Sequence, residues 1–172
     1  MKRILAAALS LALLCTLTAC GDKSLDEGET KDGVCYELTG IAPDAVVMSV
    51  DGVEVPMDMY FYTLCYTAVS MEQYMNMYGM ELDWSTELPE GGTVLDVTRK
   101  GAFRNAKYYA VLEKLAQEND IVLDAEALAQ MEADRARTAE EYGGEEGLRA
   151  RLDEMGLCEE TYDRLYRTDY LY

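Results

Sequence analysis

The clearest β pattern in the chain is a pair of short apolar runs separated by a turn dipeptide. Residues 46–50 read VVMSV and residues 53–55 read VEV, with Asp51 and Gly52 between them. An Asp-Gly pair between β-forming residues is typical of a tight hairpin turn, in which both positions adopt positive φ. We therefore predict an antiparallel hairpin. Because a single hairpin is marginally stable in water, we expect it to pack on helices.

After the hairpin, apolar residues recur every three or four positions, which is the spacing of a helix with one buried face. Pro56 can open the first helix because its missing N–H is not needed there. The stripe that we expect to be core consists of Phe61, Leu64, Ala68, Met71, Met75 and Tyr78. Thr93 and Asp96 have the spacing of a capping box at the start of the next helix. The predicted helices are 57–78, 94–119, 125–142, 145–155 and a last helix led by Leu157.

These elements predict a mostly α protein over residues 45–172, in which a small β-hairpin packs on a bundle of about five helices. The last helix carries Tyr162, Leu165, Tyr166 and Tyr170, and no stop signal follows before Tyr172. An apolar helix end of this kind continues into further structure or packs on a partner. We therefore expect a domain that is incomplete at its C-terminus or that self-associates through its last helix.

Residues 1–20 read MKRILAAALSLALLCTLTAC, a positive start followed by an apolar stretch that is shorter than the roughly 20 residues of a bilayer-spanning helix. The stretch ends in Leu17-Thr18-Ala19-Cys20, which resembles the lipobox of bacterial lipoproteins. The resemblance implies a signal peptide over 1–19, lipid on the thiol of Cys20, and a place on the extracytoplasmic face of the cell membrane. The alternative is an uncleaved anchor helix, but the polar residues after Cys20 favour cleavage.

Residues 20–44 are rich in Gly, Asp, Glu, Lys and Ser, and they are predicted to form a flexible tether between lipid and folded domain. Cys35 lies in this polar stretch, where we expect it to be exposed. Cys65 and Cys158 are expected to be buried as small apolar residues. The three cysteines are far apart in sequence and form no CxxC, so neither a disulfide framework nor a redox pair is indicated.

The amino-acid composition excludes several classes of function. The formal charge is −18 and the chain has no His. Loss of Lys2 and Arg3 with the signal would take the charge to −20. Nucleic acid is not an expected partner, because phosphate binding needs clusters of Lys and Arg. The absence of His removes His-based triads, general bases and metal sites. Nucleotide-binding and hydrolase motifs are also absent, so we expect no enzyme activity, no cofactor and no metal.

Three stretches together resemble the N-terminal chaperone region of SurA/PrsA-type extracytoplasmic foldases, whose C-terminal part often carries a parvulin-type prolyl isomerase domain. They are VDGVEV followed by MDMYF (50–61), AFRNAKYYAVLEKLAQENDI (102–121), and LDAE (123–126) with YG (142–143) and LDEMGLCEE (152–160). The resemblance implies a helical fold similar to the SurA N-terminal and trigger-factor C-terminal domains, and a chaperone that holds unfolded secreted polypeptides. Parvulin sites use paired His residues, so isomerase activity is not expected from this chain.

A holdase needs a soft apolar surface, and Met and Tyr supply one because Met is unbranched and Tyr has a polar tip. Both residue types gather around the helix 57–78. The off-stripe residues predicted to line a client groove are Met59, Tyr62, Tyr66, Tyr74 and Met77. Two alternatives stay open: the chain is a fragment of a parvulin-type isomerase, or it is a structural or adaptor lipoprotein whose Tyr-rich last helix docks on one partner.

Overall fold

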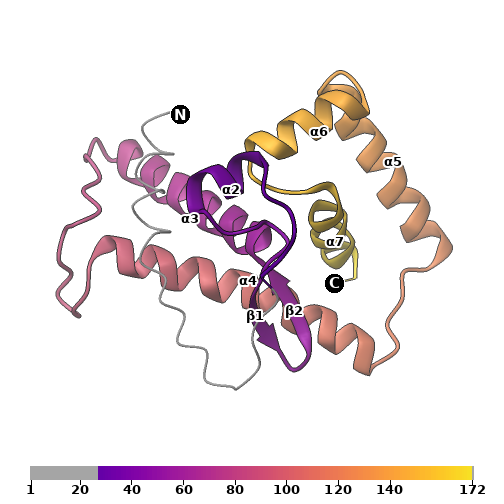
Figure 1. The fold of residues 1–172 in the computed structure, drawn as a ribbon, viewed down its shortest axis with the longest axis horizontal. Coiled ribbons are helices and arrows are strands. Elements are labelled where there is room, and N and C mark those ends of the chain that lie inside the picture. The colour runs from indigo at the N-terminus through magenta and orange to yellow at the C-terminus, as the bar shows by residue number, and fades with distance from the viewer. Residues whose placement is uncertain (1–26, 172) are drawn as a thin grey trace.

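The structure, a computed structural model, describes residues 27–171 (Figure 1). This part of the chain is mostly helical, with one two-stranded antiparallel sheet. The elements in order are α2 (Gly33–Thr39), β1 (Val46–Val50), β2 (Val53–Pro56), α3 (Met57–Met77), α4 (Val94–Glu118), α5 (Ala125–Glu141), α6 (Glu145–Glu154) and α7 (Glu159–Tyr170). The predicted fold class is confirmed at this coarse level, and all five predicted helices are present with ends within about two residues of prediction.

The hairpin forms where the sequence predicts it. Val50 pairs with Val53 across the turn, and Asp51 and Gly52 have φ of 49° and 88°. Strand alternation buries one face of the hairpin and leaves Ser49 and Glu54 exposed. The buried face, formed by Met48, Val50, Val53 and Val55, packs on α3 and α4. The hairpin is therefore held by helices, as its marginal stability requires.

The two long helices, α3 and α4, pack along each other. The Thr93 hydroxyl accepts the Asp96 N–H at 3.2 Å, and the Asp96 carboxylate accepts the Thr93 N–H at 2.9 Å. The predicted capping box is thereby confirmed at the start of α4. The small residues Ala102 and Ala106 are fully buried, which lets α3 approach α4 closely.

After α4, the chain returns to the hairpin side through α5, α6 and α7. Arg135 of α5 binds Glu145, Glu159 and Asp163, at distances of 2.7–2.9 Å, and so joins the three helices. Arg164 of α7 binds Glu113 of α4 at 2.6 Å. These contacts close the last helix onto α4 and α5.

The predicted tether over residues 20–44 is wrong for its second half. Residues 33–39 form α2, and Cys35 in it is buried, not exposed as expected. The reason is a short helical apolar pattern, Val34, Cys35, Leu38 and Ile41, that the polar composition conceals. This face packs on α3 and α6.

The start of the described chain is also held in place. The Asp44 carboxylate accepts the backbone N–H groups of Glu29 and Thr30, at 2.8 and 3.0 Å. These donors lower the pKa of Asp44 below its ordinary value.

The predicted signal peptide and Cys20 lie outside the described residues. Within residues 27–171, no helix has the length and apolar character needed to cross a bilayer.

Candidate functional site

The five residues that the sequence assigns to a client groove do not share one environment. Met59 is fully buried, so its predicted place on a surface is wrong. It lies on the same side of α3 as Tyr66 and Met77, but in the first turn. There it belongs to the core cluster that includes Val55 and Leu165, from the hairpin and α7. The helix face is thus covered at its start and uncovered further along.

None of the other four residues is fully buried. Tyr62 is half-buried against the main core cluster. Tyr66, Tyr74 and Met77 are exposed, to 63%, 54% and 71%. These three positions lie on the surface as the sequence predicts.

Two exposed neighbours extend this set, although the sequence did not assign them to the groove. Tyr78 was placed in the core stripe, but it is exposed, and so is Met80. The sequence feature that could have predicted this exposure is Gly79. The helix ends there, so no further turn follows to cover the residues of its last turn. We call Tyr66, Tyr74, Met77, Tyr78 and Met80 the arm surface.

The arm surface is exposed because α3 extends beyond the body of the protein. In Figure 1 the second half of α3 points away from the hairpin and from α5–α7. From residue 69 to the end of α3 no residue is fully buried, and the stripe residues Met71 and Met75 are half-buried. The predicted core stripe is therefore core only as far as Ala68.

Two aromatic pairs give the exposed side of α3 a defined shape. The rings of Tyr74 and Tyr78 lie 4.9 Å apart at a tilt of 57°, and those of Tyr62 and Tyr66 lie 6.4 Å apart. Rings at such distances attract each other in tilted geometry. The tyrosines thus present apolar area with little rotamer freedom left to lose on binding.

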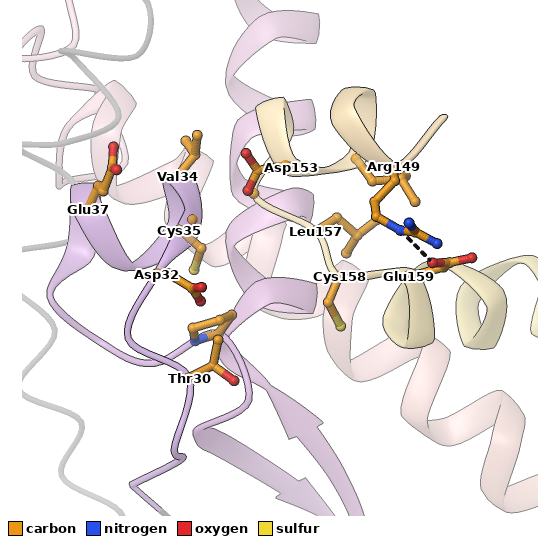
Figure 2. Close-up of a pocket in the computed structure, with 14 residues that line it drawn as sticks. Thr30, Asp32, Val34, Cys35, Glu37, Arg149, Asp153, Leu157, Cys158 and Glu159 are labelled. Atoms are coloured by element: carbon orange, nitrogen blue, oxygen red, sulfur yellow. Dashed lines mark hydrogen bonds and ion pairs between the residues drawn. The ribbon is translucent and has the colours of Figure 1, made fainter. Parts of the chain in front are cut away.

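A pocket of about 580 Å³ lies between α2, α6 and the start of α7 (Figure 2). Its floor includes Cys35, Leu152 and Leu157. Its rim is polar, and there Arg149 binds Glu159 at 3.3 Å. The pocket exists because α2 folds back on α6, so the sequence prediction of a tether could not have located it.

The buried carboxylate of Asp58 lies beside this pocket, at the start of α3. It accepts the N–H groups of Met59 and Cys158, at 2.7 and 3.1 Å, and the hydroxyl of Thr161. Desolvation nevertheless raises the pKa of Asp58 above its ordinary value. Cys158, at the N-cap of α7, is exposed, and its sulfur accepts the Thr161 N–H at 3.4 Å.

Two cysteines that are distant in sequence lie at this pocket, which sequence spacing could not reveal. Cys35 and Cys158 both line the pocket. Burial raises the pKa of Cys35 to about 12 and that of Cys65 to about 11. Burial and the nearby Asp58 also raise the pKa of Cys158. All three thiols are free, and at neutral pH they stay protonated, so they are poor nucleophiles.

No group of three or more Cys, Asp or Glu side chains in the described part is arranged to hold a metal ion.

A second cavity, of about 670 Å³, lies between the end of α4, the following connector and α7. Its apolar lining includes Val122, which is 81% exposed, with Leu128 and Leu171. Arg167 adds a positive charge to the lining. This groove is a second apolar surface, separate in sequence and in element from the arm surface.

Comparison with known proteins returned no match: neither a scan of protein-family models nor searches of curated proteins and of solved structures found one.

Proposed function

We propose that this protein is a membrane-anchored extracytoplasmic chaperone that holds unfolded secreted polypeptides and lacks a prolyl isomerase site. The observation that carries the proposal is the arm surface, five exposed Met and Tyr side chains from the middle of α3 to just beyond its end. The resemblance of the hairpin and helix order to SurA/PrsA-type N-terminal domains supports the proposal. The lipobox-like sequence before Cys20 supports the anchor.

The chemistry of the arm surface suits clients without a common sequence. Unfolded chains have exposed apolar side chains in common. A rigid pocket of one shape would bind only some of these side chains. Met77 and Met80 have flexible, polarisable side chains that repack around different partners. Tyr66, Tyr74 and Tyr78 offer flat apolar faces with hydroxyls that remain hydrated when no client is bound. Such a surface binds many chains weakly.

The acidic composition supports the same function. A net charge of −18 makes copies of the protein repel one another, so an exposed apolar surface does not lead to aggregation. The charge also attracts basic clients. We expect client binding to weaken only in part as salt is raised, because apolar contact is insensitive to screening.

The test is an aggregation-protection assay with several unrelated unfolded proteins. The arm variant combines Tyr66→Ser, Tyr74→Ser and Met77→Gln, all at exposed positions. It should keep the helical circular dichroism of the parent and lose most of its protection. The matched control combines Leu115→Gln, Val122→Ser and Tyr142→Ser, exposed apolar residues away from the arm.

The control variant is expected to protect as well as the parent. Loss of protection in the control, with protection intact in the arm variant, would move the client site to the groove beside α7. A parent that protects none of the unfolded proteins but captures one specific protein would replace the chaperone function with that of an adaptor lipoprotein.

A further inference from the structure

The outward side of α4 carries a compact group of cations and aromatic rings. Lys100, Arg104 and Lys107 are exposed and lie on one side of the helix, three and four residues apart. Phe103 and Tyr108 lie among them and are 44% and 58% exposed. We call these five residues the cationic face of α4. It lies opposite Ala102 and Ala106, on the side of α4 away from α3.

The cations of this face differ from most others in the described chain, because they have no acidic partner. Arg135, Arg137, Arg149, Arg151, Arg164 and Lys114 each bind a carboxylate. Within residues 27–171, no carboxylate lies within ion-pair distance of Lys100, Arg104 or Lys107. Lys100 only helps lower the pKa of Asp96, one turn away. No acidic residue occurs between Asp96 and Glu113.

This distribution is unexpected in a chain with 33 acidic and 15 basic residues. With carboxylates in such excess, random placement would give most cations an acidic neighbour. The cationic face instead presents three unpaired charges and two rings to the outside. Its charge fits an anionic partner, and the rings fit a partner that also has an apolar boundary.

We propose that the cationic face of α4 lies on the anionic phospholipid surface of the membrane. The inference rests on the proposed lipid anchor at Cys20. Cationic helix faces with interspersed aromatic rings are typical of helices that lie in the headgroup region. Phe and Tyr side chains partition into this boundary, while Lys and Arg stems extend their charges toward lipid phosphates.

The length of the anchor segment supports this occupant over a soluble acidic polypeptide. The described chain is fixed to the body from Glu29, through its bond to Asp44. The nine peptide links from Cys20 to Glu29 span at most about 30 Å. A lipid at Cys20 therefore holds the body within about one protein diameter of the bilayer, at high effective concentration.

Energetics explain why anchor and face are both needed. Each Lys or Arg near an anionic surface adds only a small attraction. Three such contacts are opposed by repulsion of the acidic remainder, so the face alone binds weakly. Held by the lipid, the face needs only to orient the body. Because α3 packs on the opposite side of α4, this orientation leaves α3 on the side of the body away from the bilayer.

The test places a fluorescent probe in the face. A variant with Trp84→Phe and Phe103→Trp carries one tryptophan, located between the three cations. The full chain is purified from membranes and reconstituted in vesicles that contain brominated phosphatidylcholine, with or without phosphatidylglycerol. The fluorescence of the introduced indole should be quenched about twofold or more when phosphatidylglycerol is present, and much less without it. High salt should reduce the quenching.

Charge reversal supplies the control. Lys100→Glu, Arg104→Glu and Lys107→Glu together should abolish the quenching. Lys31→Glu, Arg149→Glu and Arg167→Glu, which change the net charge equally at other exposed positions, should leave it. Equal quenching in both kinds of vesicle, or none in either, would overturn the proposal. If quenching is absent and soluble polyglutamate binds the cationic face of α4, the partner of this face is an acidic polypeptide and not the membrane.

A second experiment tests the docking of α4 separately from the acylation of Cys20. The chain from residue 20, with Cys20→Ser and an N-terminal His tag, is attached to vesicles that contain a nickel-chelating lipid. The same dependence on phosphatidylglycerol is expected there. Mass spectrometry of the membrane-purified chain tests acylation of Cys20 independently. A chain without acyl groups would refute the anchor, whereas absent quenching on the nickel vesicles would refute the docking of α4.

Discussion

The carboxylate of Asp58 accepts a hydrogen bond of 3.0 Å from the hydroxyl of Thr161, a residue 103 positions later in the chain. Both residues are buried. The same carboxylate accepts the N–H of Cys158, at 3.1 Å. One side chain therefore connects the first turn of α3 to the first turn of α7.

We expect Thr161→Val to destabilise the protein more than Thr168→Val. The two substitutions remove the same hydroxyl from buried positions of α7. The Thr168 hydroxyl donates only to the carbonyl of Arg164, within its own helix. Loss of the Thr161 hydroxyl leaves the buried Asp58 carboxylate short of one donor, which costs about 1–2 kcal/mol. Urea unfolding should show this difference, and equal midpoints for the two variants would contradict it.

The ionisation of Asp58 should make the stability of the folded protein depend on pH. Burial raises its pKa in the folded protein above the ordinary value. Its contribution to stability is therefore fully present below the ordinary carboxyl pKa and is lost as the pH rises through the raised value. Relative to Asp58→Asn, the wild-type protein should become less stable as the pH rises above the ordinary carboxyl pKa of about 4.

Asp44 provides the opposite case for the same experiment. Backbone donors lower its pKa, so its contribution to stability is present above the ordinary value and is lost as the pH falls. The stability of wild type relative to Asp44→Asn should therefore decrease toward acid. Unfolding midpoints measured across the pH range should give the two differences opposite slopes, and slopes of the same sign would show that one environment is misassigned.

The cysteines should differ in reactivity. Cys35 is buried and its pKa is raised to about 12, and the pKa of the half-buried Cys65 is raised to about 11. Cys158 is exposed, but its pKa is also raised. In the chain from residue 20 with Cys20→Ser, iodoacetamide should label Cys158 slowly and the other two only after unfolding. Peptide mapping identifies the labelled site, and rapid labelling of Cys35 in the native protein would contradict the packing of α2.

Gly156 should not tolerate a side chain. It has φ of 68°, and a Cβ there would lie 2.5 Å from a ring carbon of Phe61. Gly79 has nearly the same φ, 67°, but open space around it. Gly79→Ala should cost about 1 kcal/mol for the backbone conformation alone. Gly156→Ala should cost about 1–3 kcal/mol more, because Phe61 must shift within a packed core. Thermal unfolding of the two variants compares these costs.

Local chemistry made several elements predictable from sequence. Asp51 and Gly52 specify a turn by themselves, because few other residues adopt positive φ at low cost. Thr93 and Asp96 satisfy each other's backbone groups within one turn. In both cases the residues that determine the structure are its neighbours in sequence.

Burial was predictable only where one element is covered along its whole length. Met59 and Met77 lie on the same side of α3, yet one is fully buried and the other is 71% exposed. The difference comes from the hairpin and α7, which cover only the start of that helix. Cys35 was misplaced for the same reason, because α3 and α6 cover α2 from distant parts of the chain.

The sequence by itself therefore determined the type and approximate ends of helices α3 to α7 and the hairpin turn, since caps, breakers and periodicity act over a few residues. It also determined the composition and charge on which the proposed chaperone function rests. Only the tertiary structure decided which apolar residues form the arm surface, and that Asp58, Cys158 and Thr161 meet. Exposure depends on what packs over a residue, and partners such as Asp58 and Thr161 lie more than a hundred positions apart in sequence.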